Sequence, residues 1–133
     1  MSDSVFSKIV KKELPAHIIY EDKNTLAFLD MNPVTKGHTL VITKQPIDHI
    51  DDCPPGLYRA VFDTVYKVSK HLKKELKPKR IAIVVHGFEI PHAHVHVVPM
   101  YKGNELHLAN RSDKMLVHAK LSGVAKKIGI IRK

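Results

Sequence analysis

The stretch His92-Ala93-His94-Val95-His96-Val97-Val98 is the key to this chain, because histidines alternate in it with small apolar residues. Side chains alternate between the two faces of a β-strand. The pattern therefore predicts a strand over 92–98, with the imidazoles about 6–7 Å apart on one face and the apolar residues in the core. Because buried ring nitrogens need partners, three imidazoles in a row indicate a functional site.

Two kinds of chemistry fit such a row. A neutral imidazole is a nucleophile and a protonated one binds phosphate, so His94 in the middle can attack phosphorus while a neighbour orients it or binds an oxygen. Neutral imidazole is also a zinc ligand, although three alternate residues of one straight strand converge poorly on a tetrahedral ion. A structural role is the third interpretation. The residues of this strand alone leave all three open.

Hydrophobic patterns predict the elements around this strand. Apolar residues recur at helical spacing from Leu57 to Leu76, which indicates a long helix that Pro78 ends. A short helix is expected from the cap Ser4 to about Glu13, and a loosely periodic one over 115–127. The predicted strands cover 18–21, 25–29, 38–43, 81–85 and 92–98.

The connections between strands are mostly short, so the sheet should be largely antiparallel and the fold α+β. Pro99 is expected to end the last strand. The length of 133 residues suggests one domain.

Composition narrows the function. The formal charge of +9 favours anionic partners, but the lysines are dispersed and not interleaved with aromatic residues, so nucleic acid is an unlikely main ligand. No apolar run reaches the roughly 20 residues of a membrane span, and the N-terminus lacks the pattern of a secretory signal. Cys53 is the single cysteine. These features favour a cytoplasmic protein.

The histidine stretch resembles the motif of the histidine triad (HIT) family, which is His-apolar-His-apolar-His-apolar-apolar. Further segments resemble the family's N-terminal segment and its second and third strands. The likeness covers about 5–100 and leaves 101–133 as a tail. It implies a single HIT domain over 1–133, with a five-stranded, largely antiparallel sheet, a long helix and a C-terminal helix. The further matching segments are 6–16, 26–33 and 36–42.

The resemblance, nearest to the Hint-like branch, also implies a function. It implies hydrolysis or transfer at the α-phosphate of a nucleotide, such as a purine nucleoside phosphoramidate, through a nucleotidyl-histidine intermediate. It implies a homodimer with a continuous sheet, and neither metal nor cofactor. His94 matches the nucleophile and His96 the histidine that contacts the phosphate. His92 matches the supporting first histidine, and His38 a strand histidine that orients the triad.

The nucleotide site is expected by the same resemblance. Asp30 matches the acid that takes the ribose hydroxyls, a task that suits two acceptor oxygens. His86 and Glu89 lie in a shortened loop before the triad. An ionised Glu89 that points inward would repel a phosphate. It could instead bind an amine leaving group or simply face solvent. The segment 5–8 lacks the cysteines of the zinc site found in some bacterial relatives. The expected apolar walls of the base pocket, for which plain core is the alternative, are Phe6, Ile9, Phe28, Leu29 and Met31.

Other functions remain open on the sequence. The chain could be a dinucleoside polyphosphate hydrolase or nucleotidyltransferase of the same family. It could bind nucleotides with little turnover, a reading that Glu89 and the short loop keep open. A metal-binding protein is the remaining alternative.

Overall fold

A five-stranded sheet organises the molecule. The structure is a computed structural model, and it describes residues 4–106 and 118–132. The strand order is β1-β2-β3-β5-β4, and every neighbouring pair is antiparallel. This confirms the α+β prediction with an antiparallel sheet. The strands are β1 Ile18–Glu21, β2 Thr25–Leu29, β3 Thr39–Thr43, β4 Arg80–Val84 and β5 His94–Met100.

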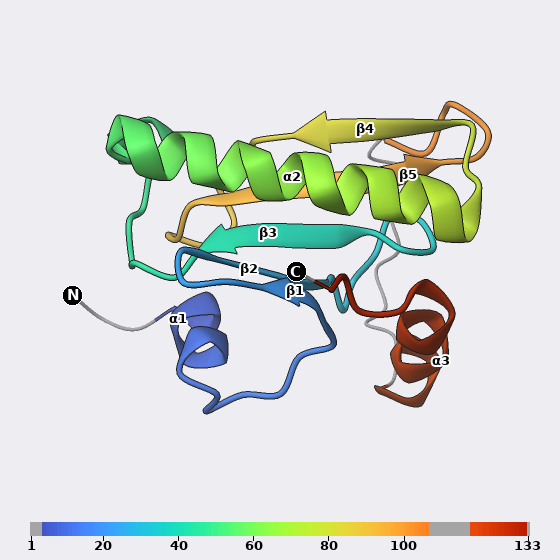
Figure 1. The fold of residues 1–133 in the computed structure, drawn as a ribbon, viewed down its shortest axis with the longest axis horizontal. Helices are drawn as coiled ribbons and strands as arrows, with labels where there is room; N and C mark the ends of the chain where they lie inside the picture. The colour runs from blue at the N-terminus through green and yellow to red at the C-terminus, as the bar shows by residue number, and fades with distance from the viewer. Residues whose placement is uncertain (1–3, 107–117, 133) are drawn as a thin grey trace.

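The long helix α2, Pro55–Leu76, lies across one face of the sheet (Figure 1). Pro55 suits its first turn because that position needs no hydrogen-bond donor. The helix ends where Lys77 takes a left-handed conformation directly before Pro78. Its buried valines meet Val41, Val95 and Val97 of the central strands. Among the described residues, no helix has the length and apolar character needed to cross a membrane.

The short helix α1, Val5–Val10, begins as predicted and ends earlier than predicted. The Ser4 hydroxyl caps it by accepting a hydrogen bond from the Ser7 backbone N–H at 3.1 Å. The chain leaves the helix before Glu13 because Lys12 is left-handed, with φ 64°. The C-terminal helix α3 covers His118–Ile128. The predicted start at 115–117 lies outside the described residues.

Strand β5 differs from the prediction at both ends. It begins at His94, because the backbone before it turns: His92 N–H donates to the Ile90 carbonyl at 2.8 Å. It also continues through Pro99. The Pro99 carbonyl accepts from the Thr35 hydroxyl at 2.6 Å, so this side of Pro99 faces the loop ahead of β3. Because β3 has not begun there, the missing proline N–H interrupts no ladder.

Candidate active site

The strand registers place the histidines beside apolar residues on the face of the sheet opposite α2. Phe28 of β2 pairs with Leu40 of β3, and Leu40 pairs with His96 of β5. Ile42 of β3 pairs with His94 in the same way. The intervening valines of β5 point to α2. The predicted alternation therefore holds for His94 and His96, and it explains how two imidazoles come to lie against an apolar wall.

The position of the proton on His94 follows from one hydrogen bond. Its Nδ1 lies 2.6 Å from the backbone carbonyl oxygen of His92. A carbonyl only accepts, so Nδ1 carries the proton and donates. The neutral ring then has its lone pair on Nε2. His94 is 3% exposed and packs edge-on against Phe6 at 5.1 Å between ring centroids. This is the tautomer that a nucleophile requires.

The ring of His92 lies just before the strand and is held on both sides. Its Nε2 donates to the Thr43 carbonyl at 2.6 Å. Its Nδ1 faces the Ser4 hydroxyl at 3.4 Å and the Ser7 hydroxyl at 3.3 Å. Burial lowers the pKa of His92, and the nearby His94 lowers it further, while the bond to Thr43 opposes the change. His92 is therefore a neutral, anchored support.

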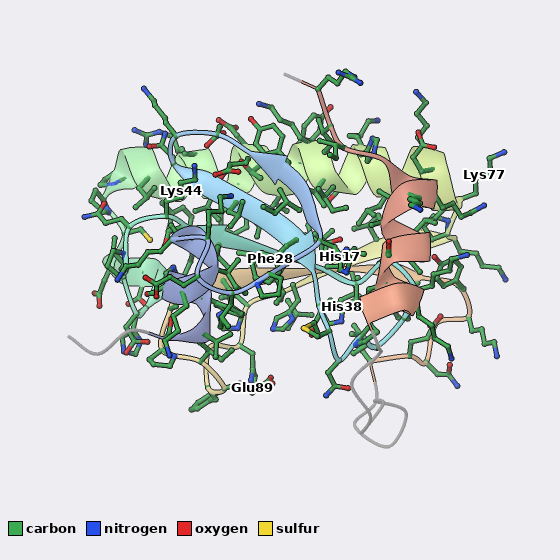
Figure 2. The ribbon with its side chains drawn as sticks, turned by 90° about the horizontal axis from the view of Figure 1, so that it is seen from below. His17, Phe28, His38, Lys44, Lys77 and Glu89 are labelled. Carbon is green, nitrogen blue, oxygen red and sulfur yellow. The ribbon has the colours of Figure 1, made fainter. Side chains whose placement is uncertain are left out.

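A second pair of imidazoles joins β5 to the start of β3. The Val34 backbone N–H donates to His38 Nδ1 at 3.0 Å, so the His38 proton is on Nε2. That Nε2 donates to His96 Nδ1 at 3.0 Å. Neutral His96 consequently carries its own proton on Nε2, as a hydrogen-bond donor. Asp30 Oδ2 lies 3.5 Å from His38 Nε2. Figure 2 labels His38 beneath the sheet, on the side away from α2.

Asp30, His38 and His96 form a cluster that could hold a metal, since one ligand atom from each lies within 4.8 Å of the others. The hydrogen bond from Val34 argues against such use. A metal on His38 Nε2 would displace that proton, and the ring would have to place a proton on Nδ1. Nδ1 would then point its N–H at the N–H of Val34. The geometry fits a proton shared between His38 Nε2 and His96 Nδ1 better than a metal ion.

An apolar cavity of about 280 Å³ lies between α1 and the loop after β2. The triad histidines are not among the residues that line it. Phe6 lines the cavity and connects it to the triad, because its ring lies 5.5 Å from the Phe28 ring and 5.1 Å from the His94 ring. Asp30 supplies a carboxylate that is 13% exposed in its side chain. All six residues expected around ribose and base line this cavity: Phe6, Ile9, Phe28, Leu29, Asp30 and Met31.

The HIT domain profile matches residues 11–103, which cover the sheet, α2 and all the histidines described above. The chain belongs to the HIT family. Proteins of this family are nucleotide-binding hydrolases or transferases, and the chain is assigned that coarse function.

Relatives of this HIT protein agree with the fold. An uncharacterised HIT-like protein of Methanocaldococcus jannaschii is 40% identical over 75% of this chain and 81% of its own length. The adenylylsulfatase HINT3 of Arabidopsis thaliana is 32% identical over 74% of this chain and 52% of its own length. The crystal structure of a Hit-like protein involved in cell-cycle regulation from Bartonella henselae superposes with a TM-score of 0.85. It is 29% identical, over 95% of this chain and 93% of its own.

Sequence reasoning missed several residues of the cavity in this HIT protein. His17 and Asn32 add polar groups to it, and the Asn32 Oδ1 is buried without a hydrogen-bond partner. Leu40 could have been found, since it lies one strand from Phe28 in the register. Val5 lies in α1, and the others come from loops far apart in the chain, which no local pattern brings together. The missed lining residues are Val5, Pro15, Ala16, His17, Asn32, Leu40 and Ile90.

His86 and Glu89 lie in the exposed loop between β4 and β5, and neither lines the cavity. The rings of His86 and Phe88 lie 4.9 Å apart at an angle of 57°, and Phe88 is 86% exposed. Figure 2 shows Glu89 at the edge of the molecule, on the side away from α2. Ile90, the residue after Glu89, does line the cavity. The loop therefore reaches the cavity through Ile90, and not through His86 or Glu89.

Proposed function

We propose that this HIT protein cleaves purine nucleoside phosphoramidates at the α-phosphorus through a nucleotidyl intermediate on His94. The observation that carries the proposal is the 2.6 Å hydrogen bond from His94 Nδ1 to the His92 carbonyl. It leaves the lone pair on Nε2 of a buried ring that packs against Phe6, which lines the cavity. In the proposal, the base enters between Phe6 and Phe28, and the ribose hydroxyls donate to Asp30.

The chemistry divides into two displacements. His94 Nε2 forms a bond to the α-phosphorus as the phosphorus–nitrogen bond of the substrate breaks, and the departing amine takes a proton from solvent. Water then attacks phosphorus, the bond to His94 breaks, and nucleoside monophosphate leaves. His96 donates from Nε2 to a phosphoryl oxygen, because the chain from Val34 through His38 assigns its proton there. The dipole of the His92 carbonyl stabilises the ring while it carries the nucleotide.

Adenosine 5′-phosphoramidate is the substrate that tests the proposal. We expect release of AMP and ammonia, and a mass increase of one adenylyl group on the peptide containing His94 after acid-free quenching. His94→Ala should lower kcat by about a thousandfold or more. Wild-type turnover by His94→Ala would overturn the assignment, and so would AMP binding with no cleavage of any amide or anhydride.

A sulfate leaving group is the second candidate, because the Arabidopsis relative is named an adenylylsulfatase. Adenosine 5′-phosphosulfate and diadenosine polyphosphate should be offered beside the phosphoramidate. Glu89 at the border of the site would repel both anionic leaving groups. We therefore expect the highest kcat/KM with the phosphoramidate, and Glu89→Gln should raise kcat/KM for the two anionic substrates more than for the phosphoramidate.

We also propose a homodimer that joins two sheets through β4. This strand lies at the sheet edge (Figure 1), and Ile83 is 50% exposed there. An exposed apolar edge strand is a template for pairing with another strand. Light scattering should give twice the chain mass, and Ile83→Lys should give the monomer. The cytoplasm is the proposed location, because the free Cys53 is buried and no other cysteine is present.

A further inference from the structure

Two serine hydroxyls of the α1 segment meet the ring of His92. Ser4 Oγ lies 3.4 Å and Ser7 Oγ 3.3 Å from His92 Nδ1. Because His92 Nε2 donates to the Thr43 carbonyl, the neutral ring has its lone pair on Nδ1 and accepts there. A serine hydroxyl is therefore the donor. His92 is 1% exposed, so a solvent molecule cannot replace the serine hydroxyl as the donor.

The same short helix forms one wall of the cavity. Val5, Phe6 and Ile9 line it, and Val5 and Phe6 stand between Ser4 and Ser7 in the sequence. The Phe6 ring packs at 6.0 Å on His92, as well as on His94 and Phe28. A base placed against Phe6 and Ile9 would therefore press on the helix whose hydroxyls hold His92.

The chain of contacts continues to the nucleophile. His92 presents its backbone carbonyl to His94 Nδ1 at 2.6 Å. A shift of α1 moves the hydroxyls on the His92 ring, and the ring is attached to the carbonyl that orients His94. Sub-ångström changes in the direction of a nucleophile alter the rate of displacement strongly.

We infer that Ser4 and Ser7 are positioning residues, through which α1 transmits occupation of the cavity by a base to the orientation of His94. The inference rests on the proposed function. It implies that the base contributes to kcat as well as to KM, because part of its binding energy is used to align the nucleophile.

The test compares adenosine 5′-phosphoramidate with ribose 5-phosphoramidate, which lacks the base. The variant Ser4→Gly/Ser7→Ala removes both hydroxyls. Glycine is a tolerated N-cap and alanine a good helix former, so α1 should persist. Ser4→Gly keeps Ser7 and serves as the rescue. Lys8→Ala changes an exposed side chain of the same helix and is the matched control.

In the wild-type protein and in Lys8→Ala, we expect the base to raise kcat by about tenfold, which corresponds to one buried hydrogen bond. In the double variant this gain in kcat should disappear, while the base still lowers KM through Phe6 and Ile9. Ser4→Gly should restore most of the gain. Ring ¹⁵N NMR should show His92 Nδ1 shifting on addition of AMP to the wild type and not to the double variant.

An unchanged effect of the base on kcat in the double variant would overturn the inference, provided that its thermal unfolding matches Ser4→Gly. So would a wild-type protein in which the base alters KM alone. Failure of the wild type to cleave either compound would overturn the proposed function, and the inference with it.

Discussion

His94 donates its Nδ1–H to the backbone carbonyl of His92 over 2.6 Å, so one triad histidine orients the other through the main chain. His92→Ala should keep this carbonyl but lose the ring bond that anchors it to Thr43. We expect kcat for adenosine phosphoramidate to fall by about a hundredfold at most, from misalignment, and less than in His94→Ala. Equal losses in the two variants would mean that the His92 ring itself reacts.

Asp30 should discriminate ribose from its deoxy forms. Its Oδ1 is already held by the Asn32 backbone N–H at 2.8 Å, which orients the carboxylate at the cavity. Asp30→Asn should weaken AMP binding by about tenfold, because an ionised acceptor is replaced by a neutral one. It should leave 2′,3′-dideoxy-AMP binding nearly unchanged. Calorimetric titration of both ligands measures this difference, and equal weakening would remove Asp30 from the ribose site.

The alternation of His94, Val95 and His96 was sufficient to predict which side chains share a face. Successive side chains of a strand point to opposite faces whatever its register with its neighbours. The spacing from Leu57 to Leu76 predicted α2 for the same reason. Both patterns are local. The start of β5 at His94 was not predictable, because it depends on a turn at Ile90 and a backbone bond from Ala93 to the Ile47 carbonyl.

The site depends on contacts between distant parts of the chain. Nothing near Ser7 in the sequence indicates that its hydroxyl meets His92, which is 85 positions away. Likewise, Pro99 usually ends a strand, and it continues β5 only because β3 begins elsewhere. The resemblance to the HIT family supplied six of the residues that line the cavity. The tautomers of His38, His92 and His94, by contrast, required the backbone groups that the fold brings to them.

The carboxylate of Glu105 should keep the loop after β5 ordered down to low pH. Partial desolvation raises its pKa, but backbone N–H bonds from Gly103, Lys102 and Tyr101 outweigh this and lower the pKa from 4.5 to about 2. A carboxyl group whose pKa is lowered in the folded state stabilises the fold at any pH above its ordinary pKa. That contribution is lost as the pH falls from 4.5 towards 2. A ¹³C titration of Glu105 should therefore show a midpoint near 2.

Glu105→Gln is the control, because it removes the charge and keeps one acceptor oxygen. Amide exchange at Lys102 and Gly103 should be faster in this variant at pH 5 than in the wild type. Equal exchange, or a Glu105 midpoint near 4.5, would show that the carboxylate does not hold the loop.

Gly37 should resist any side chain, since it takes φ 93° directly before His38. A Cβ there would overlap the Leu76 side chain and lie 3.2 Å from Pro99 Cγ. Gly37→Ala should therefore lower the free energy of unfolding by about 2 kcal/mol or more, from backbone strain and overpacking together.

Gly56→Ala is the matched control, because a Cβ at that position in α2 meets nothing within 4 Å. It should leave stability unchanged or raise it by up to about 1 kcal/mol. Urea unfolding of both variants decides the matter. If Gly37→Ala were as stable as the wild-type protein, the end of α2 and the segment before β3 could separate without cost. His38 would then lack the rigid support that its bond to His96 requires.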